Sequence, residues 1–146
     1  TTGMRGLGNM QVLIDTNVIL DVLMQRPGME VSGRILQMSG RGTIRGFLSA
    51  SAVTDIYYIL NRQIKDRART VESIKTILSL IEVADVTGAD IKAALDGGWK
   101  DFEDCVQHQV AAHNHARYII TRNVRDYEGQ EPQPVTPEDF LEDMNE

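Results

Sequence analysis

A short apolar run that stops at a carboxylate does most to limit the folds open to this chain. Met10 to Asp15 reads MQVLID, a stretch rich in residues that favour β-structure, and Asp15 directly follows the apolar residues. A strand that is buried on both faces of a parallel sheet has this continuous apolar pattern. We therefore expect a buried parallel strand whose carboxyl end presents Asp15.

The rest of the chain alternates strand-like and helical segments. Further strands are expected at Thr43–Leu48, Val83–Val86, Tyr118–Thr121 and Val135. Helices are expected over about Val18–Gln25, Glu30–Met38, from Ser49 or Ser51 to Ile64, Thr70–Ile81, Ala89–Leu95, Phe102–Ala116, and from Pro137. This alternation predicts parallel β-α-β units, and hence an α/β fold with a mostly parallel central sheet flanked by helices. Ligands of such sheets bind beyond the carboxyl ends of the strands, where the strand order reverses.

Length and composition indicate one compact domain. The 146 residues, 42% of them apolar, are enough for a single core over residues 10–146. The glycine-rich start, Thr1 to Asn9, has no periodicity and is expected to be an expression remnant or a disordered leader. No apolar run reaches the roughly 18 residues of a membrane span, and the single cysteine, Cys105, cannot form an intrachain disulfide. A cytoplasmic protein is the expectation from these features.

The net charge of −6 argues against broad electrostatic capture of nucleic acid, which needs a basic surface. A pocket that gathers carboxylates for a cation is acidic until the cation binds. The acidic balance therefore does not exclude a metal-dependent nuclease.

Acidic and amide side chains stand at four element boundaries that point to one end of the expected sheet. They are Asp15, Asp55, Asp101 with Asp104, and Asn123 with Asp126. Taken singly, each aspartate reads more simply as a helix cap or a partner of the helix dipole. Carboxylates that converge on one cleft repel each other unless they are protonated or bridged by a cation. Oxygen ligands of this kind suit Mg²⁺ or Mn²⁺ better than zinc.

The expected helix over Phe102–Ala116 has an acidic side and an apolar side. At about 100° per residue, Asp101 and Asp104 project on the same side as His108. The opposite side carries Phe102, Cys105, Val106 and Val110. Both carboxylates can thus face a cleft while the helix packs on the sheet.

The expected helix that ends at Ile64 has the same division. Its core stripe consists of Val53, Ile56, Leu60 and Ile64. Asp55, Tyr58 and Arg62 lie along the other edge. Arg62 can therefore meet a phosphate near the acids, or it is simply a solvated surface charge.

A zinc site is the alternative that the soft and imidazole ligands invite. These are Cys105, His108, His113 and His115. The helical projection puts Cys105 and His113 on the apolar side and the other two opposite, so the four cannot converge. His113 is expected to be a core histidine, and Asp21 a solvated or capping residue.

Five motifs together resemble the PIN-domain family. They are LIDTNVILD at 13–21, DIYYIL at 55–60, KDFEDCVQ at 100–107, YIITRNVRDY at 118–127 and VTPEDFL at 135–141. Their order and spacing agree with the family from about Met10 to Leu141. The resemblance implies a Rossmann-like three-layer fold and a Mg²⁺- or Mn²⁺-dependent endoribonuclease that cuts single-stranded RNA.

The resemblance also implies partners. Many members are VapC-type toxins that a small antitoxin protein neutralises, and members commonly form homodimers. The helices at Glu30–Met38 and Thr70–Ile81 are the surfaces we expect for dimer or antitoxin contact.

Metal-ligand roles of the family carry over to four places in this chain. Asp15 matches the central ligand, with Asn17 beside it. Asp55 stands where glutamate is commoner, and its shorter arm can hold the ion through water. Asp104 matches the third acid, with Asp101 as a neighbour or alternate ligand.

The fourth place departs from the family pattern. The position of the fourth acid is Asn123, whose carbonyl oxygen can bind a metal but which carries no charge. Asp126, three residues on, can supply that charge. Thr121 matches the small hydroxyl residue near the metal or the scissile phosphate. Arg122 and Arg125 are candidate RNA contacts, or surface arginines that offset nearby acids.

One other function remains open, and a third is disfavoured. A nuclease-inactive PIN module that binds RNA or a protein partner is favoured by Asp55 and Asn123, which replace stronger ligands. A small phosphatase or nucleotide-binding domain is disfavoured, because no glycine-rich phosphate loop follows the first strand.

Overall fold

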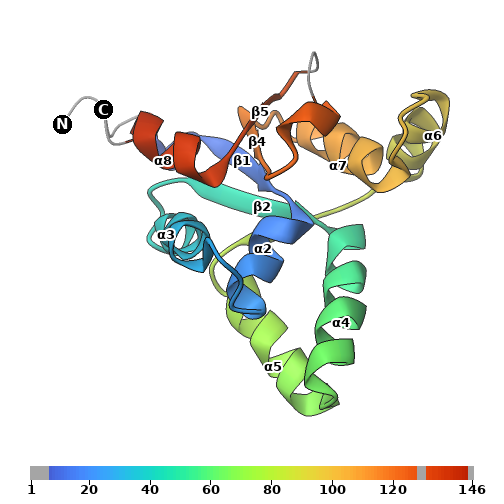
Figure 1. Ribbon diagram of the computed structural model, residues 1–146. Helices are drawn as coiled ribbons and strands as arrows, with labels where there is room; N and C mark the ends of the chain where they lie inside the picture. The colour runs from blue at the N-terminus through green and yellow to red at the C-terminus, as the bar shows by residue number, and fades with distance from the viewer. Residues whose placement is uncertain (1–6, 128–130, 145–146) are drawn as a thin grey trace.

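A five-stranded parallel sheet forms the centre of the protein, for which the computed structural model describes residues 7–127 and 131–144 (Figure 1). The strands are β1 (Gln11–Ile14), β2 (Arg45–Ser49), β3 (Glu82–Ala84), β4 (Tyr118–Ile120) and β5 (Gln133–Val135). Their order is β3-β2-β1-β4-β5, and every pairing in the described residues is parallel. The predicted α/β class is confirmed.

Helices connect and cover the strands in the order that the sequence predicted. They are α2 (Thr16–Leu23), α3 (Met29–Gly40), α4 (Ala50–Ile64), α5 (Arg67–Leu78), α6 (Gly88–Asp96), α7 (Phe102–His113) and α8 (Pro137–Met144). Two short 3₁₀ helices, Leu7–Asn9 and Val124–Tyr127, were not predicted. The first lies in the stretch expected to be a remnant or leader, whose residues 1–6 are outside the described residues.

Local signals explain where two helices differ from their predicted bounds. Helix α5 begins at Arg67 and not at Thr70, because the Asp66 side chain caps it by accepting the Arg69 N–H at 3.2 Å. Helix α7 ends at His113 and not at Ala116. His115 has a φ of 57°, a left-handed conformation that does not continue a helix.

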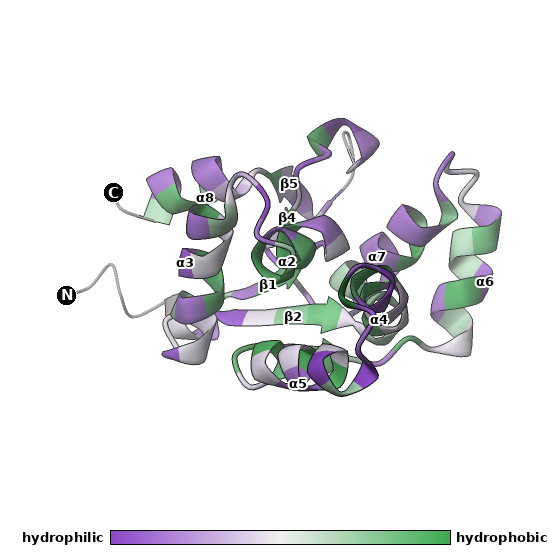
Figure 2. Cartoon of the chain, turned by 60° about the horizontal axis from the view of Figure 1, so that its bottom comes forward, coloured by the Kyte–Doolittle hydropathy of each residue, from purple (hydrophilic) through white to green (hydrophobic). Residues whose placement is uncertain are grey.

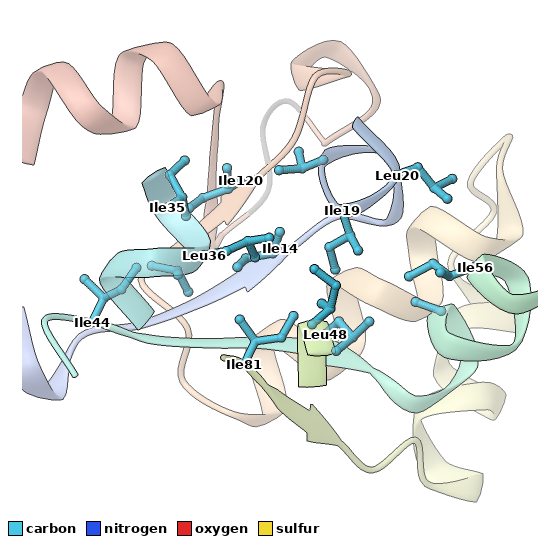
Figure 3. Close-up of a cluster of buried hydrophobic side chains, with 14 of the residues drawn as sticks. Ile14, Ile19, Leu20, Ile35, Leu36, Ile44, Leu48, Ile56, Ile81 and Ile120 are labelled. Atoms are coloured by element: carbon cyan, nitrogen blue, oxygen red, sulfur yellow. The ribbon is translucent and has the colours of Figure 1, made fainter. Parts of the chain in front are cut away.

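Two hydrophobic cores, one on each face of the sheet, make the protein three layers deep. Ile14 of β1 and Ile120 of β4 belong to the first core, with apolar residues of α2, α3, α4, α5 and α8 (Figure 3). Leu13 and Ile119 point the opposite way, into the second core, which α6 and α7 cover. Successive strand residues alternate between faces, so both faces of the sheet must be apolar.

Helix α2 is enclosed and therefore hydrophobic around most of its circumference (Figure 2). It packs between α3 and α4 and buries Val18, Ile19 and Leu20. Its first residue, Thr16, directly follows Asp15, so the packing of α2 fixes the backbone at the carboxyl end of β1.

The apolar residues of α3 and α5 pack inward. Ile35 and Leu36 of α3, and Ile74 and Ile77 of α5, all belong to the first core. Packing within the chain therefore explains the apolar residues of α3 and α5. Dimer or antitoxin contact through these two helices stays a prediction. Among the described residues, every helix is too short or too polar to span a lipid bilayer.

Arg122 is a hub that ties three helices to the end of β4. Its Nε donates to Asp21 Oδ2 of α2 at 2.6 Å, and its Nη1 donates to Glu138 Oε1 of α8 at 2.6 Å. Nη2 reaches Ser32 Oγ of α3 at 3.4 Å. A Cβ at Gly28 would clash with this guanidinium, and the φ of 94° at Gly28 also favours glycine. The expectation of a solvated or capping Asp21 is wrong, because Asp21 is buried against this arginine.

All three nitrogens of the Arg122 guanidinium take part in this network, which indicates a structural role, and the expected RNA contact of Arg122 stays a prediction. Replacing Arg122 with Met leaves the buried Asp21 carboxylate without its counter-ion. We expect the free energy of unfolding to fall by about 2 kcal/mol, below the usual loss for a buried pair because Arg122 is partly exposed.

Urea denaturation measures this loss. Arg125→Met, at an exposed position three residues away, is the matched control and should change stability little. Equal effects of the two substitutions would contradict the role assigned to Arg122.

Candidate active site

Asp15 and Thr121 stand side by side where the strand order reverses. The chain passes from β1 to β2 on one side, and later returns to β4 on the other side of β1. Asp15 follows β1 and donates its N–H to the carbonyl oxygen of Ile120 at 2.9 Å. Thr121 follows β4. This is the edge at which parallel α/β sheets bind ligands, as the sequence predicted.

Two neutral donors orient the Asp15 carboxylate, which is only 2% exposed. Gln107 Nε2 of α7 donates to Oδ1 at 2.9 Å, and the Thr121 hydroxyl donates to Oδ2 at 2.7 Å. Burial raises the pKa of Asp15, while these two hydrogen bonds lower it. Among the described residues no cationic side chain pairs with Asp15.

Asp104 is linked to Asp15 through a tyrosine and a glutamine. The Tyr127 hydroxyl donates to Asp104 Oδ1 at 3.2 Å, and Gln107 Nε2 lies 3.3 Å from the same hydroxyl. Burial and the charges of Asp15 and Asp101 raise the pKa of Asp104 to about 7. Burial also raises the pKa of Tyr127, which keeps the phenol protonated and able to donate.

Helix α7 positions these acids through its first turn. Asp101 is its N-cap and accepts the Asp104 N–H at 3.0 Å. Glu103 is half-buried, and burial followed by the charges of Asp55 and Asp101 raises its pKa to about 7. Glu103 thus brings a carboxylate from α7 next to Asp55 of α4.

Eleven residues of α2, α4, α7 and the loops before them line a pocket of about 300 Å³. They are Asp15, Thr16, Asn17, Asp55, Tyr58, Ile59, Arg62, Asp101, Glu103, Asp104 and Gln107. Five of them are carboxylates and one, Arg62, is a cation. The helical projection of α4 is confirmed, since Asp55, Tyr58 and Arg62 face this pocket together.

The residues after β4 do not line the pocket. Thr121 reaches it only through Asp15. Asn123 has an exposed side chain, and its N–H donates to Thr121 Oγ1 at 3.0 Å. Asp126 and Arg125 are exposed on the 3₁₀ helix, although the charge of Asp126 still raises the pKa of Asp104. The structure therefore leaves the fourth acid position outside the pocket lining.

Glu103, Gln107 and Tyr127 were missed by sequence reasoning. Helical spacing was an available signal for Gln107, which lies one turn beyond Asp104 and Glu103. Nothing comparable marks Tyr127, because it reaches the acids from a separate 3₁₀ helix.

The pocket offers oxygen donors that suit a hard cation. Three of its buried oxygens have no hydrogen-bond partner in the described part of the chain: Thr16 Oγ1, Glu103 Oε1 and Gln107 Oε1. Thr16 is 9% exposed and Gln107 is fully buried. Unpaired buried oxygens next to five carboxylates fit a divalent ion with its water shell, and Mg²⁺ keeps several waters when bound.

In the described residues, no three acids are placed to bind one ion directly. Across residues 7–127 and 131–144, no three His, Cys, Asp or Glu side chains converge closely enough to hold a metal. The expectation that Asp15, Asp55 and Asp104 share an ion thus requires bridging water or side-chain rotation.

The positions of the histidines and of Cys105 do not support a zinc site. His113 was expected in the core, but its side chain is 54% exposed, with Nδ1 3.5 Å from Asp90 Oδ2. His108 Nε2 lies 2.8 Å from the carbonyl oxygen of Glu131, and Cys105 is buried in the second core. His113 is the last residue of α7, where its side chain reaches Asp90 of α6 and stays in contact with solvent.

The fold is a Rossmann-like α/β domain with a carboxylate-lined pocket at the carboxyl edge of its parallel sheet. Comparison with known families then identifies the chain. It belongs to the PIN-domain family, whose sequence profile matches residues 11–125.

Solved structures of similar fold include bacterial toxin–antitoxin proteins. VapBC2 from Rickettsia felis bound to a promoter DNA fragment has a TM-score of 0.67 and 13% identity, over 87% of this chain and 98% of that one. A toxin–antitoxin complex from Klebsiella pneumoniae has a TM-score of 0.63 and 21% identity, over 86% and 97%. Mycobacterium tuberculosis VapC20, a toxin that cleaves the sarcin-ricin loop, has a TM-score of 0.61 and 16% identity, over 74% and 86%. At these identities the likeness establishes the fold. No curated protein sequence matches the chain.

Tyr127→Phe removes one hydroxyl and with it the hydrogen bond to Asp104. Residues that orient metal ligands typically contribute 10–100-fold to metal affinity, so we expect Mn²⁺ binding by calorimetry to weaken about tenfold. Tyr118→Phe, a half-buried tyrosine on β4, is the matched control. Unchanged Mn²⁺ affinity in Tyr127→Phe would show that the hydroxyl does not position Asp104.

Metal should matter more to stability as the pH rises. Glu103 and Asp104 have pKa values of about 7, above their ordinary 4.5 and 3.8, so the folded state binds protons more tightly than the unfolded state. Without metal, stability is therefore lost as the pH rises from about 4 through 7. A divalent ion replaces those protons, and the rise in Tm on adding Mn²⁺ should be larger at pH 8 than at pH 5.

Thermal melts with chelator or with Mn²⁺ at both pH values test this. In Asp104→Asn the difference between the two pH values should shrink, because one titrating group is gone. An equal rise in Tm at pH 5 and pH 8 in the unsubstituted chain would contradict the prediction.

Proposed function

We propose that this protein is a Mg²⁺- or Mn²⁺-dependent endoribonuclease that hydrolyses phosphodiester bonds in single-stranded RNA. The observation that carries the proposal is that five carboxylates line one pocket at the switch point of a PIN-domain sheet. Such a concentration of carboxylates is stable only when some of them are protonated or when a cation bridges them, and a cation there can bind a phosphodiester.

Asp15 and Asp104 are the ligands that we place closest to the ion, because buried hydrogen bonds already orient both. Asp101 lies one turn before Asp104, and Asp55 approaches from α4 across the pocket. Asn123 and Asp126 would complete the site only by moving toward the pocket. The bound ion would supply a nucleophilic water and neutralise the charge that builds on the phosphate.

The chain's own residues orient these groups. Gln107 and Thr121 each occupy one oxygen of Asp15, and each carboxylate oxygen keeps further lone pairs for the ion. Asn17 lines the pocket at the start of α2 and can contact the substrate. Arg62, the cation of the pocket, would meet the phosphate that the acids alone would repel.

We further propose that the protein is the toxin of a toxin–antitoxin pair that acts in the cytoplasm as a homodimer. Support comes from the similar folds of VapBC2, VapC20 and the Klebsiella toxin–antitoxin complex, over most of the chain. The partner would be a small antitoxin protein that covers the pocket or its rim.

A second candidate is an inactive PIN module that binds RNA or a protein partner. One observation favours it, namely that no three acids of the described residues converge on a single ion as they stand. Asn123, which carries no charge at the fourth acid position, favours it as well.

Cleavage of an unpaired RNA in Mg²⁺ separates the two candidates. We expect cleavage by the unsubstituted chain, its loss on chelation and its recovery when Mg²⁺ is restored. Asp15→Asn should lower the rate by at least about 100-fold, since loss of a ligand exceeds the 10–100-fold cost of losing an orienting residue.

The matched control is Asp85→Asn, at an exposed position outside the pocket. It should cleave at the normal rate, and melting curves should show that both variants fold. RNA binding without any cleavage by the unsubstituted chain would overturn the nuclease proposal in favour of the module.

A further inference from the structure

The turn between α4 and α5 concentrates positive charge on an otherwise acidic protein. Residues 62–69 read RQIKDRAR and hold four of the chain's 15 lysines and arginines, with Asp66 as the only acid. We call Lys65, Arg67 and Arg69 the basic turn. All three are exposed, and in the described residues none forms an ion pair with a carboxylate. Their charge is therefore available to an external anion.

The basic turn is continuous with the acidic pocket along one edge of α4. Tyr58 and Arg62 line the pocket and are four residues apart, which places them on the same side of α4. Lys65 comes directly after the last residue of α4, in the left-handed conformation that ends the helix, and begins the turn to α5. At 1.5 Å per residue, Asp55 and Lys65 are about 15 Å apart along the helix axis. Figure 1 shows α4 leading from the end of β2 to the α4–α5 turn at the tip of the molecule.

An exposed aromatic ring marks the point where this edge leaves the pocket. The Tyr58 side chain is 61% exposed, and its ring is held at 90° to that of Tyr57, with 5.2 Å between centroids. Proteins that bind single strands combine a cationic groove with aromatic rings on which bases stack. Here Tyr58 supplies the aromatic ring. Arg62 and then the basic turn supply the positive charge, in that order along the chain.

We propose that this edge of α4 is the track for the RNA strand. Tyr58 stacks on a base beside the scissile phosphate, Arg62 contacts the next phosphate, and the basic turn holds the backbone farther along. The track offsets the repulsion between a polyanion and five carboxylates, and it requires several unpaired nucleotides beyond the cut. This inference rests on the proposed function, because the pocket defines where the track begins.

Continuity with the pocket favours RNA over an acidic protein segment as the occupant. A protein partner that only covers the pocket needs charge complementarity at the rim, but it has no use for a line of cations that leads 15 Å away from it. A phosphodiester strand presents one negative charge per nucleotide in the same linear order.

Binding tests the track without cleavage. In the Asp15→Asn background, Lys65→Gln, Arg67→Gln and Arg69→Gln together remove three positive charges. The control combines Arg34→Gln, Arg41→Gln and Lys92→Gln, three exposed positions outside the pocket with the same change in net charge. The probe is a fluorescein-labelled oligouridylate, followed by anisotropy at several salt concentrations with Mg²⁺ present.

We expect the basic-turn variant to bind about tenfold more weakly than the control. Its slope of log K against log salt should fall by about 2, since each phosphate contact on a single strand contributes about 0.7. Equal slopes in the two triple variants overturn the track. So does a basic-turn variant that binds the oligouridylate as tightly as the control does.

Cleavage gives a second readout in the catalytically intact chain. The basic-turn variant should raise KM for a long oligouridylate with kcat unchanged, and should match the unsubstituted chain on a trinucleotide too short to reach the turn. Tyr58→Ala should raise KM about tenfold on both substrates, whereas Tyr58→Phe keeps the stacking surface and should not. A KM effect of the basic turn that is equal on both lengths overturns the track.

The two proposals fail in different ways. If no variant cleaves but the salt slope still falls by about 2, the nuclease assignment is wrong and the RNA track stands. If the unsubstituted chain cleaves and the two triple variants behave alike, the nuclease stands and the track is wrong.

Discussion

The hydrogen bonds that Asp15 accepts from Gln107 and Thr121 are the contacts on which the rest of this structure depends. They join the end of β1 to α7 and to the end of β4. Gln107 and Thr121 are 92 and 106 residues from Asp15 along the chain. A nearly fully buried carboxylate without a cationic partner is costly, and neutral donors offset only part of that cost. The protein keeps this charge where a ligand can reach it, which is what a cation-binding centre requires.

Much of the fold could be predicted because its signals are local. The apolar runs at Val12–Ile14 and Tyr118–Ile120, the capping residues, and the 3.6-residue periodicity of α4 each depend on neighbours a few positions away. The site edge formed by Asp55, Tyr58 and Arg62 followed from that same periodicity. Asp15 was identified because a strand buried on both faces ends at it.

What could not be predicted depends on contacts between distant segments. Tyr127 enters the site through a 3₁₀ helix without periodicity, and Gln107 is neither acidic nor basic, so a search for titratable groups passes it over. The pairing of Arg122 with Asp21 spans 101 residues, and each residue alone reads as a surface charge. His113 was wrongly assigned to the core because helical projection gives a direction but not the depth at which a helix end lies.

Asp55 and Asp104 stand on helices that belong to different cores, α4 to the first and α7 to the second. The gap between these two carboxylates therefore depends on how the layers on opposite faces of the sheet are aligned, and Glu103 of α7, next to Asp55, is the contact that joins the two helices at the pocket. A side-chain volume change deep in either layer, far from every acid, shifts that alignment. Substitutions of this kind should therefore lower the affinity for the metal ion even when they leave the melting temperature unchanged.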